Sequence, residues 1–218
     1  MSTKITPQLT KELRDRTGVG MMDCKKALEE AAGNIDQALE LLQKRGLAKA
    51  ARKSGRIAAE GCVQAYIHGA GKIGVLLEVN CETDFAARSA DFRTFVDDVA
   101  MHIAASSPAY LKQDEVPEAE VAHQREIFEA QQAQSGKKPE IVVKIVEGQI
   151  NKWKSEICLM DQLFVKDDKK TIDQVRTDLV GKIGENITIR RFVRWELGEG
   201  IEKRKYDIAA DVQAMLGT

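Results

Sequence analysis

The sequence predicts an α+β protein, in which a small N-terminal group of helices precedes an antiparallel sheet that is covered by further helices. Apolar residues recur at helical spacing over 9–42, whereas over 63–81 they alternate with polar residues, as in half-buried strands. Aromatic residues make up only 5% of the chain. The core must therefore be formed mainly from Leu, Ile, Val and Ala, which suits a helix-rich fold.

Three short helices are expected at the start of the chain. Thr6, followed by proline, is placed to cap the first helix, and glycines after residue 17 end it. Asp23 is expected to open the second helix and Asp36 to cap the third, which Gly46 ends. Six basic residues lie within 44–56, so this stretch predicts a solvated helical linker and a domain boundary near residue 55.

Three strands are expected after this boundary. In the first, Val63, Ala65 and Ile67 form the predicted buried face, and a glycine-rich turn leads to a second strand over 73–81. A third strand is expected over 187–197, where apolar residues alternate with arginines and a bulge is allowed for. These strands form the predicted antiparallel sheet.

Helices account for most of the remaining sequence. Ser89 and Thr171 are each placed to cap a helix, and two polar-faced helical stretches over 117–157 predict a helical hairpin inserted into the core. The expected division is a bundle with its basic linker over 1–55, an α+β core over 56–200 and a C-terminal helical tail over 201–218.

The bulk composition favours a water-soluble, cytoplasmic protein. Net charge is −1, but residues 1–56 hold twelve Lys/Arg against seven Asp/Glu, a local balance of +5, so the rest of the chain is acidic. No C-x-x-C pair occurs among the four cysteines, and neither a signal core nor an apolar stretch long enough to cross a bilayer is present. We therefore expect reduced cysteines, no membrane association and no nucleic-acid footprint over the whole protein.

Motifs of enzymatic sites are weak or missing. Gly18-Val19-Gly20 lies between two helices and lacks the third glycine of a dinucleotide loop. There is no phosphate-binding loop with a G-K-[ST] end, and the three histidines have no metal-ligand spacing. Cys81 lies on the apolar face of its strand, so a core thiol is favoured over a nucleophile. No cofactor or metal site is expected.

Two features remain as candidates for a contact surface. Met21 and Met22 are adjacent, so both cannot face one small core, and one of them is expected to stay exposed as an adaptable contact. Phe85 follows a strand that ends in two acids and a threonine. From composition alone, Phe85 is either folded back into the core, which is the commoner outcome, or exposed as a wedge that enters a partner.

Several segments resemble the elongation factor Ts family, in order along nearly the whole chain. Leu13–Leu28 is similar to the N-terminal signature of that family, and Val79–Phe85 to its second signature. Further similar segments are Met101–Ser106, Ile145–Gly148, Phe164–Asp167 and Arg191–Gly200.

The resemblance implies a fold and an activity. The first domain would be a three-helix bundle of the ubiquitin-associated type that contacts the nucleotide-binding domain of elongation factor Tu. The partner-binding residues would be Arg14, Met21 and Met22. The loop that dislocates Mg²⁺ in the partner, and so promotes GDP release and GTP reloading, would consist of Thr83, Asp84, Phe85 and Ala86. No covalent chemistry is implied, so the chain would be an exchange factor rather than an enzyme.

Two departures from the family pattern bear on these expectations. Ala86 stands where the family often has Val, which implies looser packing beside the wedge. The chain also has one Thr-Asp-Phe element, whereas long members have a core of two related halves, so a monomer and a homodimer through the core both remain open. Rival interpretations are an adaptor that uses the Met21–Met22 pair alone, and RNA binding through Lys44–Arg56.

Overall fold

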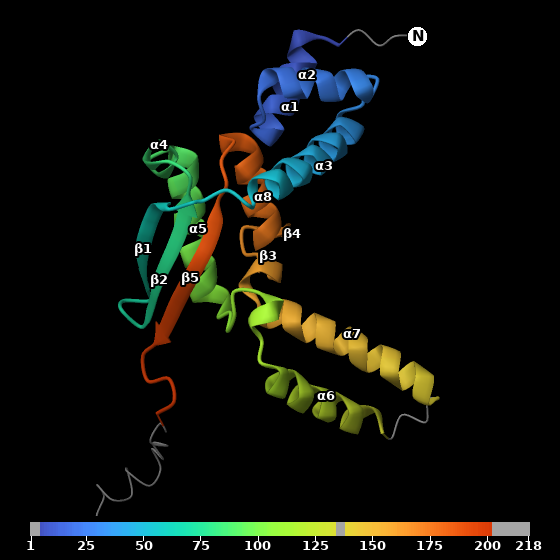
Figure 1. Ribbon diagram of the computed structural model, residues 1–218, viewed down its shortest axis with the longest axis vertical. Coiled ribbons are helices and arrows are strands. Elements are labelled where there is room, and N and C mark those ends of the chain that lie inside the picture. Colours follow the sequence, from blue (N-terminus) through green and yellow to red (C-terminus); the bar gives the residue numbers. More distant parts are fainter. Residues whose placement is uncertain (1–4, 134–137, 202–218) are drawn as a thin grey trace, which may run out of the picture.

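The computed structural model describes residues 5–133 and 138–201 (Figure 1). The helices are α1 (Pro7–Thr17), α2 (Met21–Glu30), α3 (Ile35–Lys53), α4 (Asp84–Ala87), α5 (Ala90–Ser106), α6 (Glu118–Gln132), α7 (Pro139–Ile157) and α8 (Ile172–Ile183). The strands are β1 (Glu60–His68), β2 (Ile73–Cys81), β3 (Leu163–Phe164), β4 (Asp167–Thr171) and β5 (Thr188–Glu196). Two short 3-10 turns, η1 (Gln113–Glu115) and η2 (Leu159–Asp161), complete the order. The expected α+β class is confirmed.

Helices α1 to α3 form an N-terminal group with its own apolar core. Its largest fully buried members are Leu13 and Leu28. Thr6 caps α1 as predicted, because its side chain accepts a hydrogen bond from the N–H of Leu9. Two predicted starts were wrong. Helix α2 begins at Met21, two residues before Asp23, and α3 is capped by Asn34 rather than Asp36, since the Asn34 side chain accepts the N–H of Gln37.

Helix α3 runs through Gly46 to Lys53, so the prediction that Gly46 ends it was wrong. A glycine inside a helix costs only about 1 kcal/mol, and here tertiary packing offsets that cost. The Cα of Gly46 lies 3.9 Å from the point where a Cβ on Gly181 of α8 would stand, so α3 and α8 pack closely. Ala50 of α3 is buried in the main core. The segment predicted as a solvated linker is therefore a packed helix with one exposed face.

The sheet has the antiparallel order β1-β2-β5. As predicted, Val75, Leu77, Val79 and Cys81 of β2 all face the core. The register of β2 with β5 shifts between Glu78 and Val79, which agrees with the predicted irregularity of the third strand. Helix α5, capped by Ser89 as expected, packs on β1 and β2 and contacts α8.

The buried face of β1 is the reverse of the predicted one. Val63 and Ile67 are 61% and 66% exposed, whereas Cys62 and Tyr66 pack against the core. The cause is the pairing with β2, in which Cys62 lies opposite Val79. Residues directly opposite one another share a face of the sheet, so the buried side of β2 determines which side of β1 is buried. The other side of the sheet carries exposed apolar residues.

Helices α6 and α7 pack against one another as a hairpin that extends from the body (Figure 1), as predicted. The expected connector over 135–138 lies mostly outside the described residues, as does the predicted tail helix over 201–218. Thr171 caps helix α8, as predicted, and forms a full capping box with Gln174. Among the described residues, no helix combines the length and apolarity needed to cross a membrane.

Candidate functional site

The candidate site is the turn that joins β2 to α5. Thr83 caps the four-residue helix α4, because its hydroxyl accepts the N–H of Ala86 at 3.2 Å. Phe85, one residue into that helix, is 84% exposed. Asp84 is exposed beside it and pairs with Arg88 at 3.0 Å. The structure thus excludes the alternative in which Phe85 folds back into its own core.

The turn is anchored by the buried residues that follow Phe85. Ala86 and Ala87 are 3% and 5% exposed and belong to the main core. Ala86 was included in the predicted contact loop, but in the described chain its methyl group faces inward. One turn of helix therefore points an aromatic ring outward while its other face is fixed in the core, so the ring has a rigid base.

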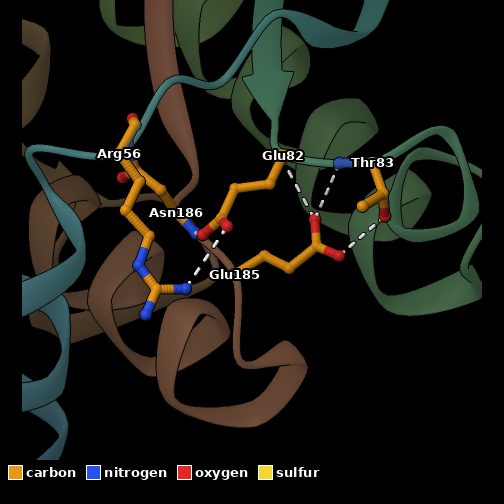
Figure 2. A network of polar contacts seen from close by, with 5 residues as sticks. All are labelled: Arg56, Glu82, Thr83, Glu185 and Asn186. Carbon is orange, nitrogen blue, oxygen red and sulfur yellow. Dashed lines mark hydrogen bonds and ion pairs between the residues drawn. The ribbon is translucent and has the colours of Figure 1, made fainter.

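A carboxylate from a distant segment also holds this turn (Figure 2). One oxygen of Glu185, Oε2, accepts the backbone N–H groups of Glu82 at 3.1 Å and Thr83 at 3.0 Å. The other oxygen, Oε1, accepts the Thr83 hydroxyl at 2.7 Å. Glu185 lies in the loop between α8 and β5, so three hydrogen bonds tie that loop to the turn.

A second set of contacts runs in the opposite direction. The Glu82 carboxylate accepts the backbone N–H of Asn186 at 2.6 Å and faces the Arg56 guanidinium at 3.4 Å. The Asn186 side chain donates to the Arg56 carbonyl at 2.8 Å. The hydrogen bond from Asn186, together with the Arg56 charge, holds the pKa of Glu82 below its ordinary value, so Glu82 stays ionised.

The predicted N-terminal contact residues lie on a different part of the molecule. Arg14 is exposed on α1, and Met21 and Met22 are 40% and 65% exposed in the first turn of α2. The expectation that the two methionines cannot both face the core is confirmed, and both of them are exposed in the first turn of α2. In Figure 1, α2 and α4 are well separated, so these residues and Phe85 form two patches rather than one site.

Other side chains that could take part in acid–base or thiol chemistry lie in the core. His102 is fully buried, its Nε2 hydrogen-bonds the Gln162 amide oxygen at 2.9 Å, and burial lowers its pKa. Burial raises the pKa of the Cys81 thiol to about 11. Within the described ranges, no three His, Cys, Asp or Glu side chains are grouped as a metal site. In the Lys44–Arg56 stretch, Arg45 and Lys49 pair with carboxylates of α2.

Sequence reasoning missed Glu185, Asn186 and Arg56. The only local signal was that Glu185 follows Gly184, which ends α8 in a left-handed conformation. Nothing in a single sequence relates Glu185 to a threonine 102 residues earlier. These residues belong to the site because of the tertiary fold.

The fold and the site together are typical of a protein that acts by contacting another macromolecule. An α+β body presents an exposed aromatic ring on a turn braced from two sides, and rigid aromatic side chains are frequent anchors in binding surfaces.

Comparison with known proteins then gives the family. The family model described as elongation factor TS matches residues 36–199. The protein named elongation factor Ts from Acetivibrio thermocellus is 56% identical over 97% of this chain and 99% of that relative. Those from Carboxydothermus hydrogenoformans and Desulforamulus reducens are 53% and 52% identical, over 97% and 98% of this chain and 98% of each relative. The chain belongs to the elongation factor Ts family, a family of translation elongation factors.

Proposed function

We propose that this protein is a cytoplasmic guanine nucleotide exchange factor that binds elongation factor Tu in its GDP state and promotes GDP release. The observation that carries the proposal is the exposure of Phe85, 84%, on a turn whose other side is fixed in the core. We infer the partner from membership of the elongation factor Ts family. The protein has the form of a wedge with a rigid base, and its activity requires binding but no covalent chemistry.

The proposed mechanism is a coupling between two binding events. The Phe85 ring enters the nucleotide-binding domain of the partner beside its Mg²⁺ and phosphate site, with Thr83 and Asp84 at the rim. A bound Mg²⁺ neutralises much of the charge of the nucleotide phosphates, so dislocating it weakens GDP binding. By linkage, GDP must weaken binding of the factor by the same ratio. GTP reloading then expels the factor.

A second contact is proposed at the N-terminal helices. Arg14 and the Met21–Met22 pair are exposed there, and flexible methionines adapt well to a partner surface. We assign this patch to affinity for the nucleotide-binding domain and Phe85 to the rate of release. As part of the same proposal, α1–α3 form a bundle of the ubiquitin-associated type, as the family resemblance implies.

The test is GDP release from elongation factor Tu, followed by the fluorescence of a labelled GDP. Wild type should accelerate release, and Phe85→Ala should lose most of that acceleration. Val143→Ala is the matched control, because Val143 is a similarly exposed apolar residue, 60%, on α7. Arg14→Ala should instead raise the concentration of factor needed for half-maximal acceleration. If Phe85→Ala accelerates release as well as wild type does, the wedge mechanism is wrong.

The GDP-release assay and the salt dependence of RNA binding separate the rival functions. An adaptor that uses only the Met21–Met22 pair would leave the partner's GDP release unchanged. Binding to RNA through Lys44–Arg56 would show a steep loss of affinity with salt. Four of the six cations in that stretch are already paired within the chain, which argues for the exchange function without direct nucleic-acid binding.

We also propose a homodimer through the outer face of the sheet. Exposed apolar side chains from all three strands share this face: Val63, Ile67, Leu76 and Trp195. A second copy is the proposed occupant, because a chain with one Thr-Asp-Phe core can complete a two-part core by pairing with itself across a two-fold axis. Sedimentation of the isolated protein tests this, and a monomer at all concentrations would contradict it.

A further inference from the structure

The turn that carries Phe85 has little stability of its own. Helix α4 is only four residues long, and a single helical turn is unstable without tertiary contacts because helix nucleation is unfavourable. Phe85 is 84% exposed, so packing of its ring contributes little to its direction. The direction of the ring is therefore determined by the groups that hold α4, which are the buried Ala86 and Ala87 on its core side and the contacts at its start.

Glu185 supplies the contacts that fix the start of this turn. Its carboxylate accepts three hydrogen bonds, from the N–H groups of Glu82 and Thr83 and from the Thr83 hydroxyl (Figure 2). Because the Thr83 hydroxyl donates its proton to Glu185, its lone pairs are left to accept the N–H of Ala86. One carboxylate thus orients the cap of α4 and the backbone before it.

The position of Glu185 is itself fixed by its neighbour. Asn186 is 4% exposed and holds both Glu82, through its N–H, and the Arg56 carbonyl, through its side chain. Two adjacent residues of the α8–β5 loop, Glu185 and Asn186, therefore hydrogen-bond to two adjacent residues of the β2–α4 turn. Rotation of the turn would have to break the hydrogen bonds of both Glu82 and Thr83, so these contacts favour one orientation of the turn.

We infer that Glu185 is a positioning residue for exchange: it acts through Thr83 to hold Phe85 in the orientation that enters the partner. The inference rests on the proposed function. Without Glu185 the ring is still present and α4 is still held from its core side by Ala86 and Ala87, but the start of the turn must be ordered at the moment of binding, and this ordering opposes entry. The loss should fall on the maximal rate of GDP release, since the N-terminal patch is unchanged.

Three variants test the role of Glu185. Glu185→Ala removes both acceptor oxygens and with them all three hydrogen bonds, and we expect the maximal release rate to fall about tenfold, equivalent to about 1.4 kcal/mol. Glu185→Gln should stay within about twofold of wild type, because its carbonyl oxygen can accept both backbone N–H groups and its amide can donate to the Thr83 hydroxyl. Glu156→Ala is the control, since that exposed carboxylate pairs with Lys152 on the same helix, away from the turn.

A double variant separates positioning from general stability. If Glu185 acts through Phe85, Glu185→Ala should have no further effect on release in a Phe85→Ala background. Equal fold losses in both backgrounds, or a wild-type rate for Glu185→Ala, would overturn the inference. Either result would leave the proposed function intact as long as wild type accelerates release and Phe85→Ala does not.

Amide hydrogen exchange gives a readout that does not depend on the partner. In the isolated protein, the amides of residues 82–87 should exchange faster in Glu185→Ala than in wild type, and Glu185→Gln should restore protection. The amides of β2 should be unaffected, because the sheet pairing does not involve Glu185. Unchanged amide hydrogen exchange over 82–87 in Glu185→Ala would also overturn the inference. This result would count even if wild type proved to have no effect on GDP release.

Discussion

Truncation of Phe85 should remove function with almost no loss of stability. Phe85 is 84% exposed, so only about 16% of its surface is buried, and a fully buried Phe contributes about 1.5–3 kcal/mol. Phe85→Ala should therefore lower the free energy of unfolding by about 0.2–0.5 kcal/mol, the product of these values. The matched comparison is Phe92, seven residues later on α5 and fully buried. Phe92→Ala should cost about 3–5 kcal/mol.

The assay is urea unfolding followed by far-ultraviolet circular dichroism, since the chain is rich in helix. Both variants should keep the slope of the free energy against urea, and only Phe92→Ala should shift the midpoint strongly. A cost above about 1 kcal/mol for Phe85→Ala exceeds what an exposed site normally shows. That result would mean that the ring packs within its own chain in solution, and the assignment of Phe85 to a partner contact would be wrong.

Three further predictions concern the sheet and the core. Gly61→Ala should destabilise the fold by about 2–4 kcal/mol, because the φ of Gly61 is +137° and a Cβ would lie 2.1 Å from the Val79 carbonyl oxygen. The control is Gly148→Ala. It should not destabilise the fold, because Gly148 lies inside α7 with open space around it. The contribution of Cys81 and Cys158 to the free energy of unfolding should be fully present below about pH 9 and be lost between pH 9 and about 11, because burial raises the pKa of both thiols from 9.0 to about 11 and the unfolded state loses these protons first. Ile67→Lys should abolish the proposed dimer in sedimentation while leaving the midpoint of urea unfolding of the monomer unchanged, since Ile67 is 66% exposed.

Each of these predictions has a result that contradicts it. Equal midpoints for the two glycine variants would show that β1 and β2 are not as close at Gly61 as described. Cys81→Ala should flatten the alkaline loss of stability, so an unchanged slope would assign that loss to other groups. A dimer that survives Ile67→Lys would move the interface away from the outer face of the sheet.

The sequence predicted the elements that depend on local contacts. The caps Thr6, Ser89 and Thr171 were predicted correctly, because a capping side chain bonds to a backbone N–H only two or three residues away. The buried face of β2 was also correct, since five apolar residues alternate there without interruption. The same alternation misled in β1, where both faces carry apolar residues and only the register with β2 decides which is buried.

Tertiary packing determined what the sequence could not show. Gly46 has the local signature of a helix end, yet α3 continues because its second half packs against α8 and buries Ala50 in the main core. At the candidate site, the position of Phe85 followed from its place after a strand, and its role followed from the resemblance. Its exposure and the Glu185 contacts depend on segments that are distant in the sequence, and no local pattern encodes them.

The continuity of α3 sets a fixed spacing between the two proposed contact patches. Its 19 residues span about 28 Å at about 1.5 Å per residue, and the helix runs without a break from the N-terminal bundle into the main core. The N-terminal bundle and the main core are therefore joined by a continuous helix rather than by a flexible linker. Selection on the length of this helix would act through geometry, because one added residue would turn the bundle by about 100° about the helix axis and carry its methionines away from their target.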